Sequence, residues 1–174
     1  MSQLVVGIGD CQVSADPQCT LITYALGSCI AVAVYDPVTK VGGLLHYLLP
    51  DSNIDLEKAQ KNPFMFGDTG IPELFHRAYR MGAQKQRLIV SVAGGAQVMS
   101  SEYFNIGKRN QLVAKKVLWR AGVLVRHEET GGESSRTLRM ELATGQIMLR
   151  TAGRFEVVLG STPNPVSKKG AQCA

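Results

Sequence analysis

The feature that most constrains the fold of this chain is an uninterrupted apolar run in its first quarter. Residues 30–35 read Ile-Ala-Val-Ala-Val-Tyr, and the turn-forming pair Asp36-Pro37 follows at once. A run of this length without polar alternation is typical of a strand that is buried on both faces. Such a strand needs packed structure on either side of it, so the run predicts a layered fold.

Further strand-like segments occur along the whole chain. Leu138, Met140 and Leu142 alternate with polar residues, and a second strand-like segment follows Ala143-Thr144-Gly145. This pattern predicts a hairpin in which Gly145 adopts a positive φ. With the run above, the predicted strands number about eight, and the others are residues 4–8, 41–49, 87–93, 123–127, 137–142, 146–150 and 155–159.

Two segments show helical periodicity. The first follows Asp68-Thr69-Gly70, and Gly82 is expected as its C-terminal cap. Its apolar stripe consists of Ile71, Leu74, Phe75, Ala78 and Met81. The second runs from about Lys108 to Ala121, with Asn105 as a candidate N-cap and Gly122 beyond its end. Its expected apolar face consists of Leu112, Val113, Val117, Leu118 and Ala121, and its basic face of Lys108, Arg109, Lys115, Lys116 and Arg120.

These elements predict an α/β (α+β) fold, a layered sandwich of β-sheets with two or three helices. The chain has 174 residues, of which 45% are hydrophobic and 19% are charged, a balance typical of globular proteins and not of disordered ones. We expect one domain over residues 1–160 and a flexible tail over 161–174, which contains two prolines and two lysines.

Composition also bears on the location of the protein and on its partners. No apolar run approaches the roughly 18–20 residues that span a bilayer, and the first residues lack the pattern of a signal peptide. A cytoplasmic protein without membrane insertion is therefore expected. Lys and Arg outnumber Asp and Glu by 19 to 14, a net charge of +5. This excess fits nucleic acid, an anionic membrane or an acidic protein as partner, and it equally fits a role in solubility alone.

One cysteine lies where a nucleophile would be well placed. Leu26-Gly27-Ser28-Cys29 leads directly into the buried strand. Glycine permits a tight turn whose backbone N–H groups can face a reacting carbonyl, so Gly27 and Ser28 are candidates for oxyanion support. The alternative is that Cys29 is a small buried hydrophobic residue, as most such cysteines are.

Two further residues could complete a catalytic set. His46 lies seventeen residues after Cys29, enough for a strand, a turn and a returning strand that places an imidazole beside the thiol. Thr23 lies six residues before Cys29, where a hydroxyl could orient that imidazole. The alternatives are a core histidine and an ordinary strand threonine. The remaining histidines, His76 and His127, are expected to be structural or at the surface.

Other kinds of site find little support in the sequence. The phosphate-binding patterns G-x-G-x-x-G and G-x-x-x-x-G-K-[ST] are absent, and no cluster of carboxylates and histidines suggests a metal. Ile106-Gly107-Lys108-Arg109-Asn110 opens the basic helix, and it either binds an anion or simply starts a helix with a solvated face. Aromatic residues make up only 6% of the chain, so no nucleic-acid partner is expected.

The ordered set of these motifs resembles the family of chemoreceptor glutamine deamidases called CheD. The resemblance covers most of the chain, from about residue 6 to residue 158. Two positions depart from the common family pattern, since Ala25 stands where Gly is frequent and Leu45 where Asn is frequent. The motifs that carry the resemblance are Thr23-Tyr24-Ala25-Leu26-Gly27-Ser28-Cys29, Tyr35-Asp36-Pro37, Gly42-Gly43-Leu44-Leu45-His46-Tyr47-Leu48-Leu49-Pro50, Gly94-Gly95-Ala96, Ile106-Gly107-Lys108-Arg109-Asn110 and Gly131-Gly132.

The resemblance implies a specific chemistry. Cys29 would be the nucleophile, His46 the general base and Thr23 the third member of the triad, in an α/β sandwich related to the deamidating bacterial toxins. The reaction would convert receptor glutamines to glutamate and release ammonia through a thioester, without a cofactor. Expected partners are methyl-accepting chemotaxis receptors with acidic helices, and a CheC-type phosphatase in organisms that have one. The alternative is an adaptor that binds these partners with little catalysis. A monomer is expected.

Overall fold

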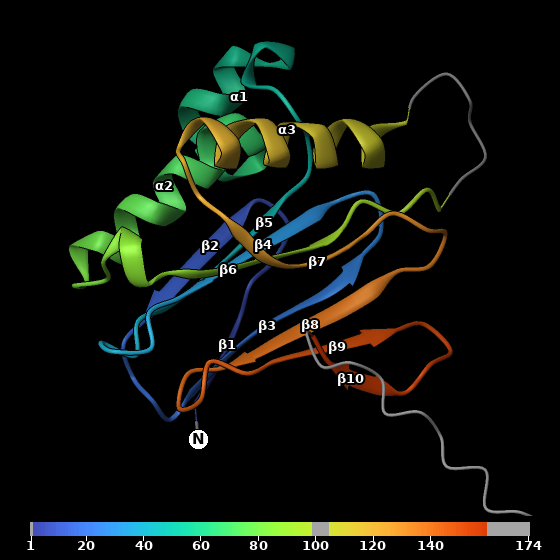
Figure 1. The fold of residues 1–174 in the computed structure, drawn as a ribbon. Helices are drawn as coiled ribbons and strands as arrows, with labels where there is room; N and C mark the ends of the chain where they lie inside the picture. Colours follow the sequence, from blue (N-terminus) through green and yellow to red (C-terminus); the bar gives the residue numbers. More distant parts are fainter. Residues whose placement is uncertain (1, 99–104, 160–174) are drawn as a thin grey trace, which may run out of the picture.

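The computed structural model describes residues 2–98 and 105–159, which form two five-stranded sheets and a layer of helices (Figure 1). The first sheet has the order β1-β3-β8-β9-β10, in which β1 and β3 are parallel and the other pairs are antiparallel. Its strands are β1 (Ser2–Val5), β3 (Cys19–Leu26), β8 (Arg136–Glu141), β9 (Ile147–Thr151) and β10 (Glu156–Val158).

The second sheet has the order β2-β5-β4-β6-β7, with only β6 and β7 parallel. Its strands are β2 (Asp10–Ser14), β4 (Ile30–Tyr35), β5 (Gly42–Tyr47), β6 (Ile89–Gly94) and β7 (Val125–Thr130). The helices cover its outer face, while its inner face meets the first sheet (Figure 1). They are η1 (Ser52–Ile54), α1 (Leu56–Lys61), η2 (Pro63–Met65), α2 (Gly67–Arg80), η3 (Lys85–Arg87) and α3 (Ile106–Arg120).

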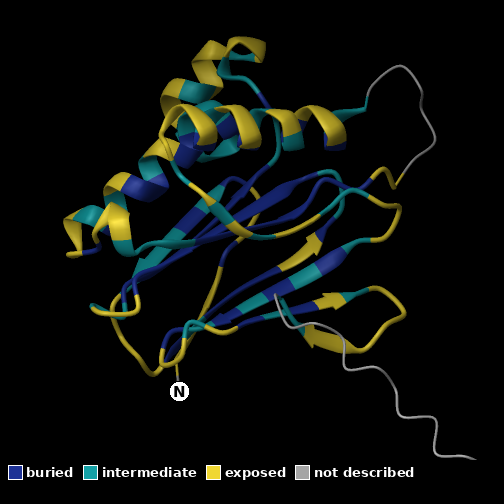
Figure 2. Ribbon diagram, viewed as in Figure 1, coloured by how far each residue is buried: buried dark blue, intermediate teal, exposed yellow. Residues whose placement is uncertain are grey.

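The predicted layered fold is therefore confirmed, with the second sheet in the middle. Every residue of β4 and β5 is buried, and Figure 2 shows these strands enclosed between the helices and the first sheet. One apolar core joins the second sheet to α2 and α3, and a second core lies between the two sheets. Alternate residues of β4 point into these two cores, which explains why its sequence shows no polar alternation.

Local predictions from turn and cap residues are confirmed. Gly145 has a φ of 74°, and a Cβ there would lie 2.1 Å from the ring of Tyr35. Gly82 and Gly122 follow α2 and α3 with positive φ. Asn105 caps α3, because its side-chain oxygen accepts a hydrogen bond from the backbone N–H of Lys108.

Some assignments were incomplete or wrong. Leu112 is 56% exposed, whereas the buried side of α3 consists of Gly107, Asn110, Ala114 and Leu118. The predicted face is correct at Leu118 and Val117, which pack in or against the core, and wrong at Leu112, because the helix also packs through small residues. The structure adds α1 and the edge strand β2 to the predicted elements, and it gives bounds to the strand around Thr23. The predicted tail, 161–174, lies outside the described residues. In the described part of the chain, no helix combines the length and apolarity needed to cross a membrane.

Candidate active site

Cys29 lies in a short loop, residues 27–29, that joins β3 in one sheet to β4 in the other. All three carbonyl oxygens of this loop accept hydrogen bonds. The backbone N–H groups of Ala96 and Gly95 donate to Gly27 and Cys29, at 2.8 and 2.7 Å. The side-chain nitrogen of Asn110 donates to Ser28 at 2.9 Å. The loop is thus fixed from the turn after β6 and from α3.

His46 lies on β5, where it pairs directly with Ala31 of the adjacent strand β4. Paired residues of an antiparallel ladder point to the same face, and so do alternate residues along one strand. Cys29 precedes Ala31 by two residues and packs with it in the core between the sheets. The thiol and the imidazole are therefore diagonal neighbours on one face, a relation in which Cα atoms lie about 7–8 Å apart.

Thr23 reaches the imidazole from the opposite sheet. Its hydroxyl lies 2.7 Å from Nδ1 of His46 and donates to the carbonyl oxygen of Val6, also at 2.7 Å. Because the hydroxyl proton is given to Val6, Thr23 is left to accept a hydrogen bond from Nδ1–H. This arrangement favours the tautomer in which Nε2 carries the free lone pair. Buried Nε2 has no hydrogen-bond partner among residues 2–98 and 105–159.

Burial keeps both side chains uncharged at neutral pH. Loss of solvation raises the pKa of the Cys29 thiol above its ordinary value of 9.0. The same effect lowers the pKa of His46 from 6.5 to about 4. The described residues show no hydrogen bond between the two side chains. The thiol and the imidazole are therefore both neutral at rest.

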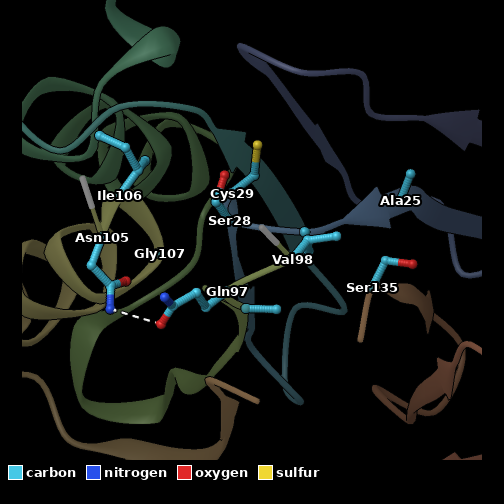
Figure 3. A pocket seen from close by; sticks show the side chains of 11 residues that line it. Ala25, Ser28, Cys29, Gln97, Val98, Asn105, Ile106, Gly107 and Ser135 are labelled. Carbon is cyan, nitrogen blue, oxygen red and sulfur yellow. Dashed lines mark hydrogen bonds between the residues drawn. The ribbon is translucent and has the colours of Figure 1, made fainter. Parts of the chain in front are cut away.

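A pocket of about 570 Å³ opens beside Cys29. Figure 3 shows its walls: Asn105, Ile106 and Gly107 lie on one side, Ala25 and Ser135 on the other, and Ser28 and Cys29 between them. Gly27 also lines it, so the whole 27–29 loop borders the pocket. An extended side chain such as that of glutamine fits a space of this size.

The remaining histidines and cysteines of the described residues do not line this pocket. His76 is exposed on α2 within 3.8 Å of Glu73, and His127 on β7 lies 3.2 Å from the hydroxyl of Ser91. Cys11 and Cys19 are buried thiols, and Cys173 lies outside the described residues. Within the described ranges, no three His, Cys, Asp or Glu side chains gather to hold a metal ion.

The sequence did not predict that Asn110 contacts the loop of Cys29. It predicted an anion site or a plain helix start for the segment that begins at Ile106, whereas this segment packs on the 27–29 loop. A signal was present in the spacing of Gly107, Asn110, Ala114 and Leu118, which places an amide on a helix face of otherwise small or apolar residues.

Comparisons with known proteins agree on one family. A family model described as CheD chemotactic sensory transduction matches residues 48–151. The chain is 47% identical over 164 residues to the probable chemoreceptor glutamine deamidase CheD of Solibacter usitatus, covering 94% of this chain and 97% of that relative. It is 50% identical over 154 residues to the probable chemoreceptor glutamine deamidase CheD 1 of Syntrophus aciditrophicus, covering 88% and 96%.

A third relative is less similar in sequence but is matched over nearly the same share of its length. The chemoreceptor glutamine deamidase CheD of Thermotoga maritima is 38% identical to this chain over 152 residues, which cover 87% of this chain and 94% of that relative. The matched lengths show that nearly the whole of each relative corresponds to this chain. The chain therefore belongs to the CheD family.

Proposed function

We propose that this protein is a chemoreceptor glutamine deamidase, which hydrolyses the side-chain amide of receptor glutamines to glutamate and ammonia. The observation that carries the proposal is the bond between Thr23 and His46, which leaves Nε2 free on the face that it shares with Cys29. The names of the relatives supply the substrate class.

The first half of the reaction forms a thioester. Nε2 of His46 takes the thiol proton as the sulfur of Cys29 attacks the amide carbon. The negative charge that develops on the carbonyl oxygen is stabilised by backbone N–H groups of the 27–29 loop. When the tetrahedral intermediate collapses, the carbon–nitrogen bond breaks and the imidazolium gives its proton to the leaving ammonia.

The second half regenerates the enzyme. Neutral His46 removes a proton from water, and the resulting hydroxide attacks the thioester carbon. The carbon–sulfur bond then breaks, the thiolate recovers a proton from the imidazolium, and the product is glutamate. Thr23 holds the imidazole in one tautomer through both halves. Each proton is accounted for by side chains of this chain and water, so the proposed reaction uses no cofactor.

The proposed partners and location follow from the same substrate. Chemoreceptors with acidic helices are the proposed partners, and the net charge of +5 favours their approach. We further propose one deamidase domain over residues 1–160 that acts as a monomer in the cytoplasm, with a CheC-type phosphatase as a second partner where an organism has one.

The test is mass spectrometry of a receptor cytoplasmic fragment after incubation with the wild-type protein and with Cys29→Ala. Each Gln→Glu conversion adds about one mass unit, and we expect it with wild type and not with Cys29→Ala. Cys19→Ala is the matched control, because it also removes a buried thiol but one that lies away from the pocket. It should retain conversion.

Two results would contradict the proposal. Conversion that persists in Cys29→Ala would remove the nucleophile assignment. Fragment binding by wild type without any conversion, across receptors from the same organism, would favour the adaptor function instead.

A further inference from the structure

The side chain of Asn110 connects the two halves of the candidate active site. It is fully buried in α3, and its nitrogen donates to the carbonyl oxygens of Ser28 and Leu48, each at 2.9 Å. Ser28 precedes Cys29, and Leu48 lies just after the strand that carries His46. One amide group therefore bridges the loop of the thiol and the strand of the imidazole.

The orientation of this amide is determined by its neighbours. If nitrogen and oxygen were exchanged, the oxygen would face two carbonyl oxygens, so the donor must point toward Ser28 and Leu48. Asn110 is also held by its backbone, since the hydroxyl of Tyr47 donates to its carbonyl oxygen at 2.5 Å. The side-chain oxygen has no partner among the described residues. A buried unsatisfied oxygen is unfavourable, so the two donated bonds are the favourable contribution of this amide.

These donated bonds have a consequence for the reacting carbonyl. In a trans peptide the N–H and C=O groups point in opposite directions. Asn110 fixes the carbonyl oxygen of Ser28, so it also directs the N–H of Cys29 away from α3. Ala96 does the same for the N–H of Ser28 through the carbonyl oxygen of Gly27. Within residues 2–98 and 105–159, no other residue accepts a hydrogen bond from either N–H group, although the N–H of Cys29 interacts with its own sulfur.

We infer that Asn110 is a positioning residue for the deamidation: its side-chain amide orients the Ser28–Cys29 peptide as an oxyanion donor and fixes the loop of Cys29 against the strand of His46. This inference rests on the proposed function. It assigns Asn110 to stabilisation of the transition state and not to formation of the thiolate, because its bonds end on backbone carbonyls and not on sulfur or imidazole.

The test compares two reactions of the same thiol in Asn110→Ala. Deamidation forms an oxyanion, whereas alkylation of Cys29 by iodoacetamide occurs at a saturated carbon and forms none. We expect kcat for the receptor fragment to fall by about tenfold to a hundredfold, with KM and the alkylation rate each within about threefold of wild type. Leu118→Ala is the control, since it truncates another buried residue of the α3 face that bears Asn110 and should retain kcat.

A second variant keeps the test informative if Asn110→Ala does not fold. Tyr47→Phe removes only the hydroxyl that holds the backbone of Asn110 and should lower kcat by a smaller factor, with alkylation unchanged. If both Asn110→Ala and Tyr47→Phe deamidate at the wild-type rate, the inference is overturned and the proposed function stands. It is equally overturned if alkylation slows in parallel with deamidation. If the wild type converts no glutamine while Cys29 is still alkylated, both the inference and the proposed function fail.

Discussion

At the scale of single residues, His46 is held in an environment that suits a base and opposes a cation. Its imidazole is 1% exposed, and its one hydrogen bond ends on a hydroxyl that has already donated its proton. Among residues 2–98 and 105–159, no carboxylate is hydrogen-bonded to it that would stabilise the charged form. The imidazole is therefore neutral at neutral pH, and its Nε2 is available to accept a proton.

This environment predicts that stability depends on pH. The pKa of His46 is about 4 in the folded protein, below the ordinary 6.5, so between these values the unfolded chain binds more protons. The contribution of His46 is complete above pH 6.5 and is lost as the pH falls toward 4. The free energy of unfolding should lose about 3 kcal/mol from this residue. Urea titrations between pH 7 and 4.5 measure it.

The matched variants are His46→Gln and His76→Gln. His46→Gln should make the free energy of unfolding less dependent on pH. His76→Gln replaces an exposed histidine and should preserve that dependence. If the free energy of unfolding changed with pH equally in wild type and His46→Gln, burial would not hold this imidazole neutral.

Ala25 departs from the common family pattern, in which glycine is frequent, and the structure gives the physical reason for that preference. Its φ is 53°, and the pairing of β3 with β8 shifts register between Thr23 and Leu26. An L-residue in this region is strained, so Ala25→Gly should stabilise the protein by about 0.5–1 kcal/mol. The urea midpoint should rise at an unchanged slope. The control is Ala33→Gly, in the regular strand β4, which should lower the urea midpoint. A lower midpoint for Ala25→Gly would show that Ala25 is not strained.

Leu45, the other departure from the family pattern, does not alter the site. It packs in the core between the second sheet and the helices, on the opposite face of β5 from His46. Leu45 therefore contacts the helix side of the sheet and not the face that carries His46.

At the scale of elements, the close approach of α3 to the turn after β6 supports the loop of Cys29. A Cβ on Gly107 would lie 2.7 Å from the carbonyl oxygens of both Gly95 and Ala96. The N–H groups of these two residues hold the loop of Cys29. The contact therefore leaves no space for a methyl group without moving the loop.

Gly107→Ala tests this contact. In an exposed helix the change stabilises by about 1 kcal/mol, whereas here we expect destabilisation by about 1–3 kcal/mol and a drop in kcat. Thermal unfolding and the receptor assay measure the two effects. Lys116→Ala, on the exposed side of α3, is the control and should leave both unchanged. A stabilised Gly107→Ala would show that α3 does not fix the loop.

At the scale of the whole molecule, the net charge of +5 predicts a dependence on salt. Attraction between this charge and acidic receptor helices is screened over about 10 Å at 0.1 M salt and about 3 Å at 1 M. KM for the receptor fragment should rise severalfold between 0.05 and 0.5 M NaCl, while kcat stays within about twofold, since the site itself is buried. Initial rates at several fragment concentrations measure both. A KM that does not respond to salt would exclude electrostatic steering.

The sequence by itself determined the layers and many of the boundaries, because these depend on local patterns. An apolar run without alternation can only be covered on both faces, as β4 is. Gly82, Gly122 and Gly145 take conformations that other residues avoid, so they mark ends and turns directly. The spacing of Thr23, Cys29 and His46 allowed a catalytic set and the resemblance to CheD implied one, and their roles stay a prediction.

Only the tertiary structure decided which groups meet. Thr23 and His46 lie in different sheets, and their hydrogen bond exists because the two sheets face each other. Asn110 is 81 residues from Cys29 in the chain, yet its amide holds the adjacent peptide. The burial that makes the thiol and the imidazole neutral comes from both sheets and the helices together. Periodicity records which face of an element is buried, but not what lies against it, and the chemistry of this site depends on the latter.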